Sequence, residues 1–323
     1  MIAVQADRVW RATIALMRAR GAAILSLLVV GCATAPAPPA GSPGADDPVA
    51  AGKRWRDLTR AKEANEARSL CTPWLTAASK PLAIEGHKCL AQVELIDSYK
   101  LRLQDGKEAE ASLGVGYTGP GVDRAIDHLT KAIALAPDNL SIHLSRLHIA
   151  INSPRATDAP KLLADSLDRY HGPDAIDDWA SYAQELRQSH HGEVGLDYLR
   201  VLEKRYPGDH RVAGNIGTLL ISLKRDEEGL PYLRRAVELA PNDAIDTWNL
   251  GRFHEKHGSP ASAEPLYRRA VSLEKDPARR QDMACNLGRF LAAQPATHAE
   301  GCAEAAKKCG RPVPECAPTP AAP

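Results

Sequence analysis

The sequence predicts an all-α protein built from repeated helical hairpins, and three observations support this fold class. First, small residues recur in steps of 34 at Ala183, Gly217 and Gly251. Second, apolar residues four positions apart, such as Ile216 and Leu220, give the first helix of a hairpin one apolar stripe. Third, Pro207 and Pro241 follow two second helices, which end there because proline has no N–H to donate and does not fit the next turn.

Other positions of the same three units keep the 34-residue step. One set consists of small residues, Gly195, Gly229 and Ala263, and another of larger ones, Leu199, Leu233 and Tyr267. A third set is Leu202, Ala236 and Ala270. Small side chains let the two helices of a hairpin approach closely. Gly258 lies where the turn between helices requires a permissive backbone. In the third unit Lys275 replaces the closing proline, and Pro277 follows.

A helix–turn–helix unit with this period resembles the tetratricopeptide repeat (TPR). The resemblance implies a right-handed superhelical solenoid of about six units over residues 51–309, three of them strict and three degenerate. Degenerate units are expected at the ends, since terminal units present a polar outer face.

The flanking segments extend the pattern with less regularity. Ala125, Leu129 and Ala132 predict a second helix, and its first helix is expected over 87–103. The glycine-rich residues 103–121 between them predict an inserted loop. At the other end, the Asn-Leu-Gly motif that begins at Asn249 returns at Asn286, and residues 298–309 are expected to form the last helix.

The amino terminus is typical of a secretory signal. Its apolar stretch, 21–31, is too short for a membrane span, which takes about 20 residues, and arginines precede it. The ending Val29-Val30-Gly31-Cys32 resembles a bacterial lipobox. The resemblance implies a signal peptide over 1–31, with Met17 as an alternative start, and lipidation of Cys32, which would anchor the chain stably in a membrane.

The segments beyond the predicted solenoid are rich in proline. Residues 32–50 predict a tether, since their Pro/Ala/Gly content disfavours helices and offers nothing to bury, and 310–323 predict a Pro-rich tail. Ala33 follows the cysteine in place of the aspartate that often retains lipoproteins in the inner membrane. We therefore expect the outer membrane, on its periplasmic face.

Charge and cysteine usage narrow the function further. With 41 basic and 40 acidic residues the chain lacks the basic excess of a nucleic-acid binder. Six cysteines besides Cys32 lie near the two ends of the predicted solenoid. In an oxidising compartment an even number predicts disulfides, although six thiols allow 15 pairings. The separations favour Cys71 with Cys89 and Cys285 with Cys302, each pair clamping a terminal hairpin.

The sequence offers no catalytic constellation, metal site or cofactor site, so we expect a non-enzyme. His254 and His257 are three apart in "HEKH", whereas HExxH metal sites need a spacing of four and a third ligand. His254 occupies the register position of Leu186 and Leu220, which favours a core or rim role.

The TPR resemblance implies that an extended peptide or partner helix binds on the concave surface lined by first helices. The candidates are Gln184, Arg187, Arg211, Asn215, Thr218, Trp248, Asn249, Arg252 and Asn286. The asparagines could donate to and accept from a peptide backbone, or only bond to a neighbouring helix. Trp248 beside Arg252 is either a stacking platform or a core tryptophan.

Two classes of function remain. The first is a scaffold that binds a protein or peptide partner in the cell envelope, with a role in assembling an outer-membrane complex. The alternative is a glycan- or peptidoglycan-binding or structural envelope protein. The mixed Asn, Arg and Gln lining favours a peptide, because a glycan groove would be dominated by aromatic and acidic side chains.

Overall fold

The computed structural model describes residues 47–104, 116–310 and 316, and all regular secondary structure in these ranges is helical. The predicted all-α fold class is therefore confirmed. The expected signal peptide, Cys32, most of the tether and most of the inserted loop and tail lie outside the described residues. Within the described ranges, no helix combines the length and apolarity that a membrane span requires.

The chain divides into two compact units, residues 1–93 and 94–323. The described part of the first unit contains four elements, α2 (Pro48–Arg60), α3 (Ala64–Cys71), the 3-10 helix η1 (Thr72–Thr76) and the start of α4 (Lys80–Gln104). Asp47 caps α2 by accepting from the Val49 N–H, so the last residues of the expected tether are helical. The α4 helix likewise begins before the expected residue 87.

A disulfide and a buried tryptophan hold this first unit together. Cys71 pairs with Cys89 as predicted, which ties the end of α3 to α4. The indole Nε1 of Trp55 on α2 donates to Glu85 Oε2 on α4 at 2.8 Å. Helices α2 and α3 are therefore both fixed to α4, α2 by a hydrogen bond and α3 by a disulfide.

The second unit consists of successive helical hairpins. Its helices after α4 are α5 (Gly121–Leu135), α6 (Leu140–Ile151), α7 (Ala159–Arg169), α8 (Ile176–Gln188), α9 (Gly192–Arg205), α10 (His210–Ser222), α11 (Asp226–Leu239), α12 (Ala244–Lys256), α13 (Pro260–Leu273), α14 (Pro277–Ala292) and α15 (His298–Lys308), with the 3-10 helix η3 (Ala156–Asp158) before α7. An ion pair of Arg124 with Glu94 joins α5 to the second half of α4. From α6 on, the described helices pair in order as α6–α7, α8–α9, α10–α11, α12–α13 and α14–α15.

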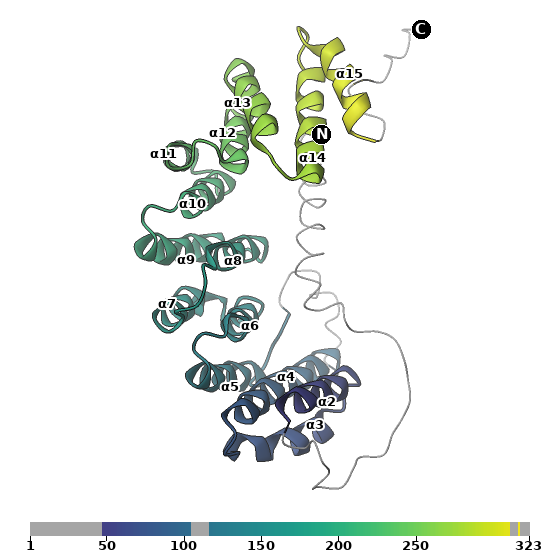
Figure 1. The fold of residues 1–323 in the computed structure, drawn as a ribbon, viewed down its shortest axis with the longest axis vertical. Helices are drawn as coiled ribbons and strands as arrows, with labels where there is room; N and C mark the ends of the chain where they lie inside the picture. Colours follow the sequence, from purple (N-terminus) through teal and green to yellow (C-terminus); the bar gives the residue numbers. More distant parts are fainter. Residues whose placement is uncertain (1–46, 105–115, 311–315, 317–323) are drawn as a thin grey trace. The chain divides into compact units, whose positions relative to one another are not determined.

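The hairpins of the second unit stack in two layers (Figure 1). Helices α6, α8, α10 and α12, the first of their hairpins, contact one another in order and form one layer. Among the second helices, α7 contacts α9, and α11 and α13 each pack against the first helix of their own hairpin. The first-helix layer is therefore a continuous surface, which is where the sequence places the binding residues.

The 34-residue series of small residues marks the points where helices cross. A Cβ added to Gly217 would lie 3.0 Å from the Gly229 carbonyl oxygen, and one added to Gly195 would lie 3.0 Å from that of Ala183. Such distances are tighter than nine in ten of the contacts that real Cβ atoms make. The predicted close approach within these hairpins is confirmed.

The turns within three hairpins share one backbone conformation. His190, Lys224 and Gly258 have positive φ angles of 64°, 66° and 66°, and they are again 34 residues apart. Glycine adopts this left-handed region without steric cost, whereas histidine and lysine do not. A left-handed backbone conformation is thus present at three turns, whereas the sequence indicated it only at Gly258.

A buried arginine lies in the degenerate α6–α7 hairpin. Leu147 stands near the crossing point where the strict units have glycine or alanine, and it is fully buried. The Arg146 side chain is 1% exposed. Its guanidinium donates to the Leu162 carbonyl at 3.1 Å and to the Ser166 hydroxyl at 2.9 Å. It also forms an ion pair with Asp165 at 2.7 Å. Arg146 therefore bridges two helices that bulkier residues keep apart.

The predicted pairing of Cys285 with Cys302 is wrong. Cys285 pairs with Cys309, and Cys302 pairs with Cys316. The register of the hairpin is the reason: Gly288 on α14 packs against Ala305 on α15. Three residues back along α14 correspond to three residues forward along α15, so Cys285 faces the region of Cys309.

Candidate functional site

The nine residues predicted to line a binding surface all lie on first helices. Gln184 and Arg187 are on α8, Arg211, Asn215 and Thr218 on α10, Trp248, Asn249 and Arg252 on α12, and Asn286 on α14. Arg252 is exposed and the other eight are half-buried. Their contact with a partner stays a prediction, but the structure separates those used internally from those that are not.

Arg211 connects two neighbouring hairpins. Its guanidinium donates to Asp174 Oδ2 and Asp209 Oδ2, both at 2.8 Å, and pairs with Asp177 at 3.3 Å. These carboxylates, Asp209 first, raise the pKa of Arg211. The side chain is therefore committed to joining the start of α10 to the start of α8.

Two further candidates bond within one helix. On α8, Arg187 Nε donates to Gln184 Oε1 at 3.1 Å, and burial lowers the pKa of Arg187. On α10, Asn215 Nδ2 donates to the Arg211 carbonyl at 2.8 Å, one turn back in its own helix. Asn215 therefore bonds its own helix, and not the neighbouring helix of the stated alternative.

Asn249 and Asn286 differ from Asn215. Both amides are half-buried, and within the described part of the chain neither has a hydrogen-bond partner, nor does the Thr218 hydroxyl. An amide group can donate two hydrogen bonds and accept two. These side chains are thus available to bond an incoming polar chain.

Trp248 is part of the core of the α12–α14 region. Its ring lies 4.3 Å, centroid to centroid, from that of Tyr267, and it packs against the buried cluster that includes Ala263, Leu287 and Phe290. One face of the indole is therefore occupied. The core alternative for Trp248 accounts for its position.

His210, Asp243 and Asp246 form the described side-chain group that most resembles a metal site. His210 Nδ1 lies 2.6 Å from Asp246 Oδ2, and Asp243 accepts from the Asp246 N–H at 2.8 Å as the cap of α12. Burial raises the pKa of Asp246 to about 6, against the opposing effect of the His210 hydrogen bond. Each group already has a structural partner, so we assign no metal to them.

The two histidines of "HEKH" have separate surroundings. His254 is half-buried with its ring against Phe253, and burial lowers its pKa. His257 Nε2 lies 3.4 Å from Asp226 Oδ2 on α11. The rim role expected for His254 fits this arrangement.

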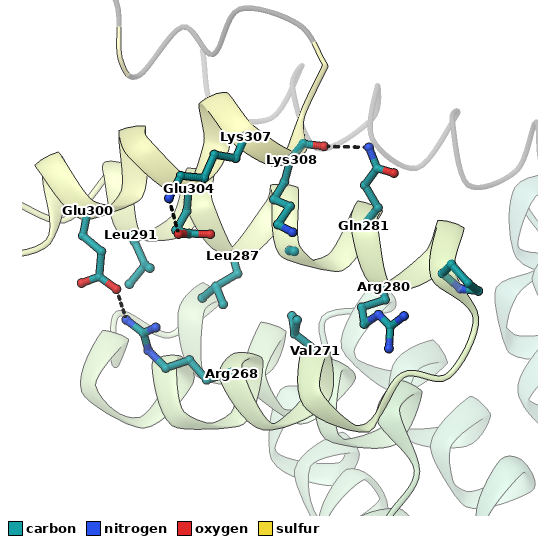
Figure 2. A pocket seen from close by; sticks show the side chains of 12 residues that line it. Arg268, Val271, Arg280, Gln281, Leu287, Leu291, Glu300, Glu304, Lys307 and Lys308 are labelled. Atoms are coloured by element: carbon teal, nitrogen blue, oxygen red, sulfur yellow. Dashed lines mark hydrogen bonds and ion pairs between the residues drawn. The ribbon is translucent and has the colours of Figure 1, made fainter.

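A pocket that the sequence did not indicate lies between α13, α14 and α15 (Figure 2). Its volume is about 580 Å³, within the roughly 300–1,000 Å³ typical of ligand pockets. The lining residues are Arg268, Val271, Pro277, Arg280, Gln281, Ala284, Leu287, Leu291, Glu300, Glu304, Lys307 and Lys308. Apolar side chains from α13 and α14 thus share one hollow with charged side chains of all three helices.

The comparisons with known proteins agree on the repeat. The family model of the tetratricopeptide repeat matches residues 210–243, the α10–α11 hairpin. No curated protein matches in sequence.

Solved structures similar to this chain include PilF of Pseudomonas aeruginosa (16% identity, 69% of this chain and 90% of that one, TM-score 0.38). A second is YrrB, described as a TPR protein with an unusual peptide-binding site (15% identity, 62% of this chain and 95% of that one, TM-score 0.35). A third is human IFIT1 with PPP-AAAA (16% identity, 82% of this chain and 59% of that one, TM-score 0.42).

Proposed function

We propose that this chain is a lipid-anchored, non-catalytic TPR scaffold of the cell envelope that binds an extended segment of a partner protein on its first-helix surface. The observation that carries the proposal is the pair of unbonded amides, Asn249 and Asn286, which begin the same Asn-Leu-Gly motif on α12 and α14.

An extended peptide offers what these amides lack. Its backbone presents N–H donors and carbonyl acceptors at regular intervals, whatever its side chains. The amide atoms of Asn249 and Asn286 are not among the fully buried atoms that lack a partner, so solvent reaches them. A peptide backbone that bonds both amides would replace water there and read the shape of the chain more than its sequence.

The stack also holds this surface in place before a partner arrives. Arg235 on α11 donates to the Pro207 carbonyl, and 34 residues later Arg269 on α13 donates to the Pro241 carbonyl at 2.7 Å. The repeated bond links each second helix to the end of the preceding one. A preorganised surface loses less entropy on binding, which favours affinity.

An exported location accords with the cysteines. The three disulfides use all six cysteines after Cys32, and disulfides persist in oxidising compartments such as the periplasm. Cys32 itself lies outside the described residues, and its lipidation is proposed on the lipobox resemblance. With a lipid anchor at the outer membrane, assembly of an outer-membrane complex is the process that we propose the scaffold assists.

The glycan alternative has less support. Sugar rings bind to exposed aromatic faces, whereas Trp248 on the first-helix surface packs against Tyr267 with the two rings tilted. The other candidate residues on the first helices are amides, arginines and Thr218. A peptide therefore fits this surface better than a glycan.

The test is in-vivo photocrosslinking with a photoreactive residue at Asn249. The control position is Arg234, which is exposed on the second helix α11. We expect a discrete protein adduct at 249 that is absent at 234, and we expect Asn286→Ala to weaken it because the second amide bonds the same segment. Wall fragments in place of a protein adduct would favour the glycan alternative, and equal labelling at both positions would refute the first-helix surface.

A further inference from the structure

The pocket between α13, α14 and α15 is separate from the first-helix surface. Its lining residues on α14 include Gln281, Ala284, Leu287 and Leu291, which recur every three or four positions and so share one side of the helix. Asn286 falls on the other side of α14 by the same spacing. A ligand in this pocket would therefore leave the Asn249–Asn286 surface uncovered.

Part of the charge around the pocket is internally neutralised. Arg268 Nη2 on α13 donates to Glu300 Oε1 on α15 at 2.7 Å, and Lys307 lies 3.5 Å from Glu304 (Figure 2). Both carboxylates that line the pocket are thus paired. Little negative charge remains to attract a cation.

The other end of the pocket carries two cations without a carboxylate partner. Among the described residues, the Lys308 ammonium has no hydrogen bond or ion pair, and Arg280 donates only to the Glu274 carbonyl, at 3.4 Å. Figure 2 shows the Lys308 side chain directed toward the space above Val271, with the Arg280 side chain to one side of Val271. This end is therefore positive and open to an anion.

The floor beneath these cations is apolar. Val271 and Ala284 are half-buried, and Leu287 and Leu291 belong to the core cluster below. Covering such a surface is favourable, because it removes apolar area from water. A small inorganic anion would leave the floor uncovered, whereas an acidic peptide with an apolar side chain would satisfy both features.

We propose that this pocket binds an acidic segment of a partner protein, which places a carboxylate between Arg280 and Lys308 and an apolar side chain on Val271 and Leu287. Charge complementarity selects the partner and steers its approach. The apolar contact adds to the binding energy by covering Val271.

The tail of this chain is not the occupant that the geometry favours. Cys316 is bonded to Cys302, which lies about half a turn around α15 from the lining residues Glu300 and Glu304. The disulfide therefore holds Cys316 at the side of α15 that faces away from the pocket.

The test uses the full chain in detergent and a capped, fluorescent peptide of alternating leucine and aspartate, followed by anisotropy. Matched peptides carry lysine for aspartate or serine for leucine, and we expect both to bind on the order of tenfold more weakly. We expect a similar loss for the double variant Arg280→Glu, Lys308→Glu. Ala284→Phe, which fills the pocket, should abolish binding, whereas Ala306→Phe, exposed on the far side of α15, should not.

Each contrary outcome is distinguishable. Equal binding of the lysine and aspartate peptides, or no effect of the charge reversal, would overturn the proposal. Loss of a dimer in the charge-reversed protein without peptide would identify a second copy of the chain as the occupant. The double variant Asn249→Ala, Asn286→Ala should bind the acidic peptide as tightly as the native protein does. The pocket proposal can therefore be refuted without refuting the proposal for the first-helix surface.

Discussion

His210 and Asp246 join two neighbouring first helices through a single short contact. The Asp246 side chain is 6% exposed, and its carboxylate lies 2.6 Å from His210 Nδ1. Asp243 and Asp209 lie near it and, with burial, raise its pKa. A buried carboxylate of this kind favours its protonated form, which makes the α10–α12 contact sensitive to pH.

We expect Asp246→Asn to change how stability depends on pH. The folded-state pKa of about 6 is above the ordinary value of 3.8, so Asp246 favours folding below pH 4, and this contribution is lost as pH rises to 6. The variant should therefore gain stability relative to the native protein over that range, by at most roughly 2–3 kcal/mol. Urea unfolding at several pH values measures this, and parallel curves for the two proteins would contradict it.

At the scale of the element, the turn between two helices sets the geometry of a hairpin. His190, Lys224 and Gly258 occupy one left-handed position in three turns. Their backbone N–H groups each bond a carbonyl three residues back, Arg187, Ile221 and Glu255 respectively. The backbone conformation is thus conserved among the units of this chain, although only one of them has the residue that suits it.

Lys224→Gly should stabilise the protein by about 0.5–1 kcal/mol, because glycine removes the steric cost of the positive φ. The Lys224 side chain is exposed and makes no contact among the described residues that would be lost. Lys224→Ala is the matched control and should bring no gain. Thermal unfolding compares them, and equal midpoints for the glycine and alanine variants would refute the explanation.

At the scale of the whole molecule, the second unit is a stack in which each hairpin contacts mainly its neighbours. The largest buried cluster extends from Leu147 on α6 to Leu220 on α10. Beyond it the clusters are smaller, and the last hairpin carries the Cys285–Cys309 bond between its two helices. In such a stack stability is a sum of local terms, so the ends open first.

Replacing Cys285 and Cys309 by serine should open the last hairpin while the centre stays protected. A disulfide that closes a loop of this length contributes about 3 kcal/mol. We expect faster hydrogen exchange in α14 and α15, with α8–α11 unchanged. Serine at Cys302 and Cys316 is the control, since that bond ties α15 to Cys316 and does not join α15 to α14. Equal effects of both pairs would contradict this prediction.

Several site residues could be placed on a helix but not given a role from the sequence. The 34-residue step put Arg211, Trp248 and Asn249 on first helices, and the structure agrees. Spacing along one helix does not show what the neighbouring hairpin brings to it. Asp174 engages Arg211 and Tyr267 engages Trp248, while Asn249 has no such partner among the described residues.

The sequence by itself determined the helical class, the period of the hairpins and the crossing points at Gly217 and Gly251, because these depend on contacts that recur locally every 34 residues. It also supplies the lipobox resemblance at Cys32. The tertiary structure alone decided the pairing of Cys285 and the pocket beside Arg280 and Lys308. Both depend on the register of one helix against another, which shifts with turn length and packing and leaves no periodic trace in the chain.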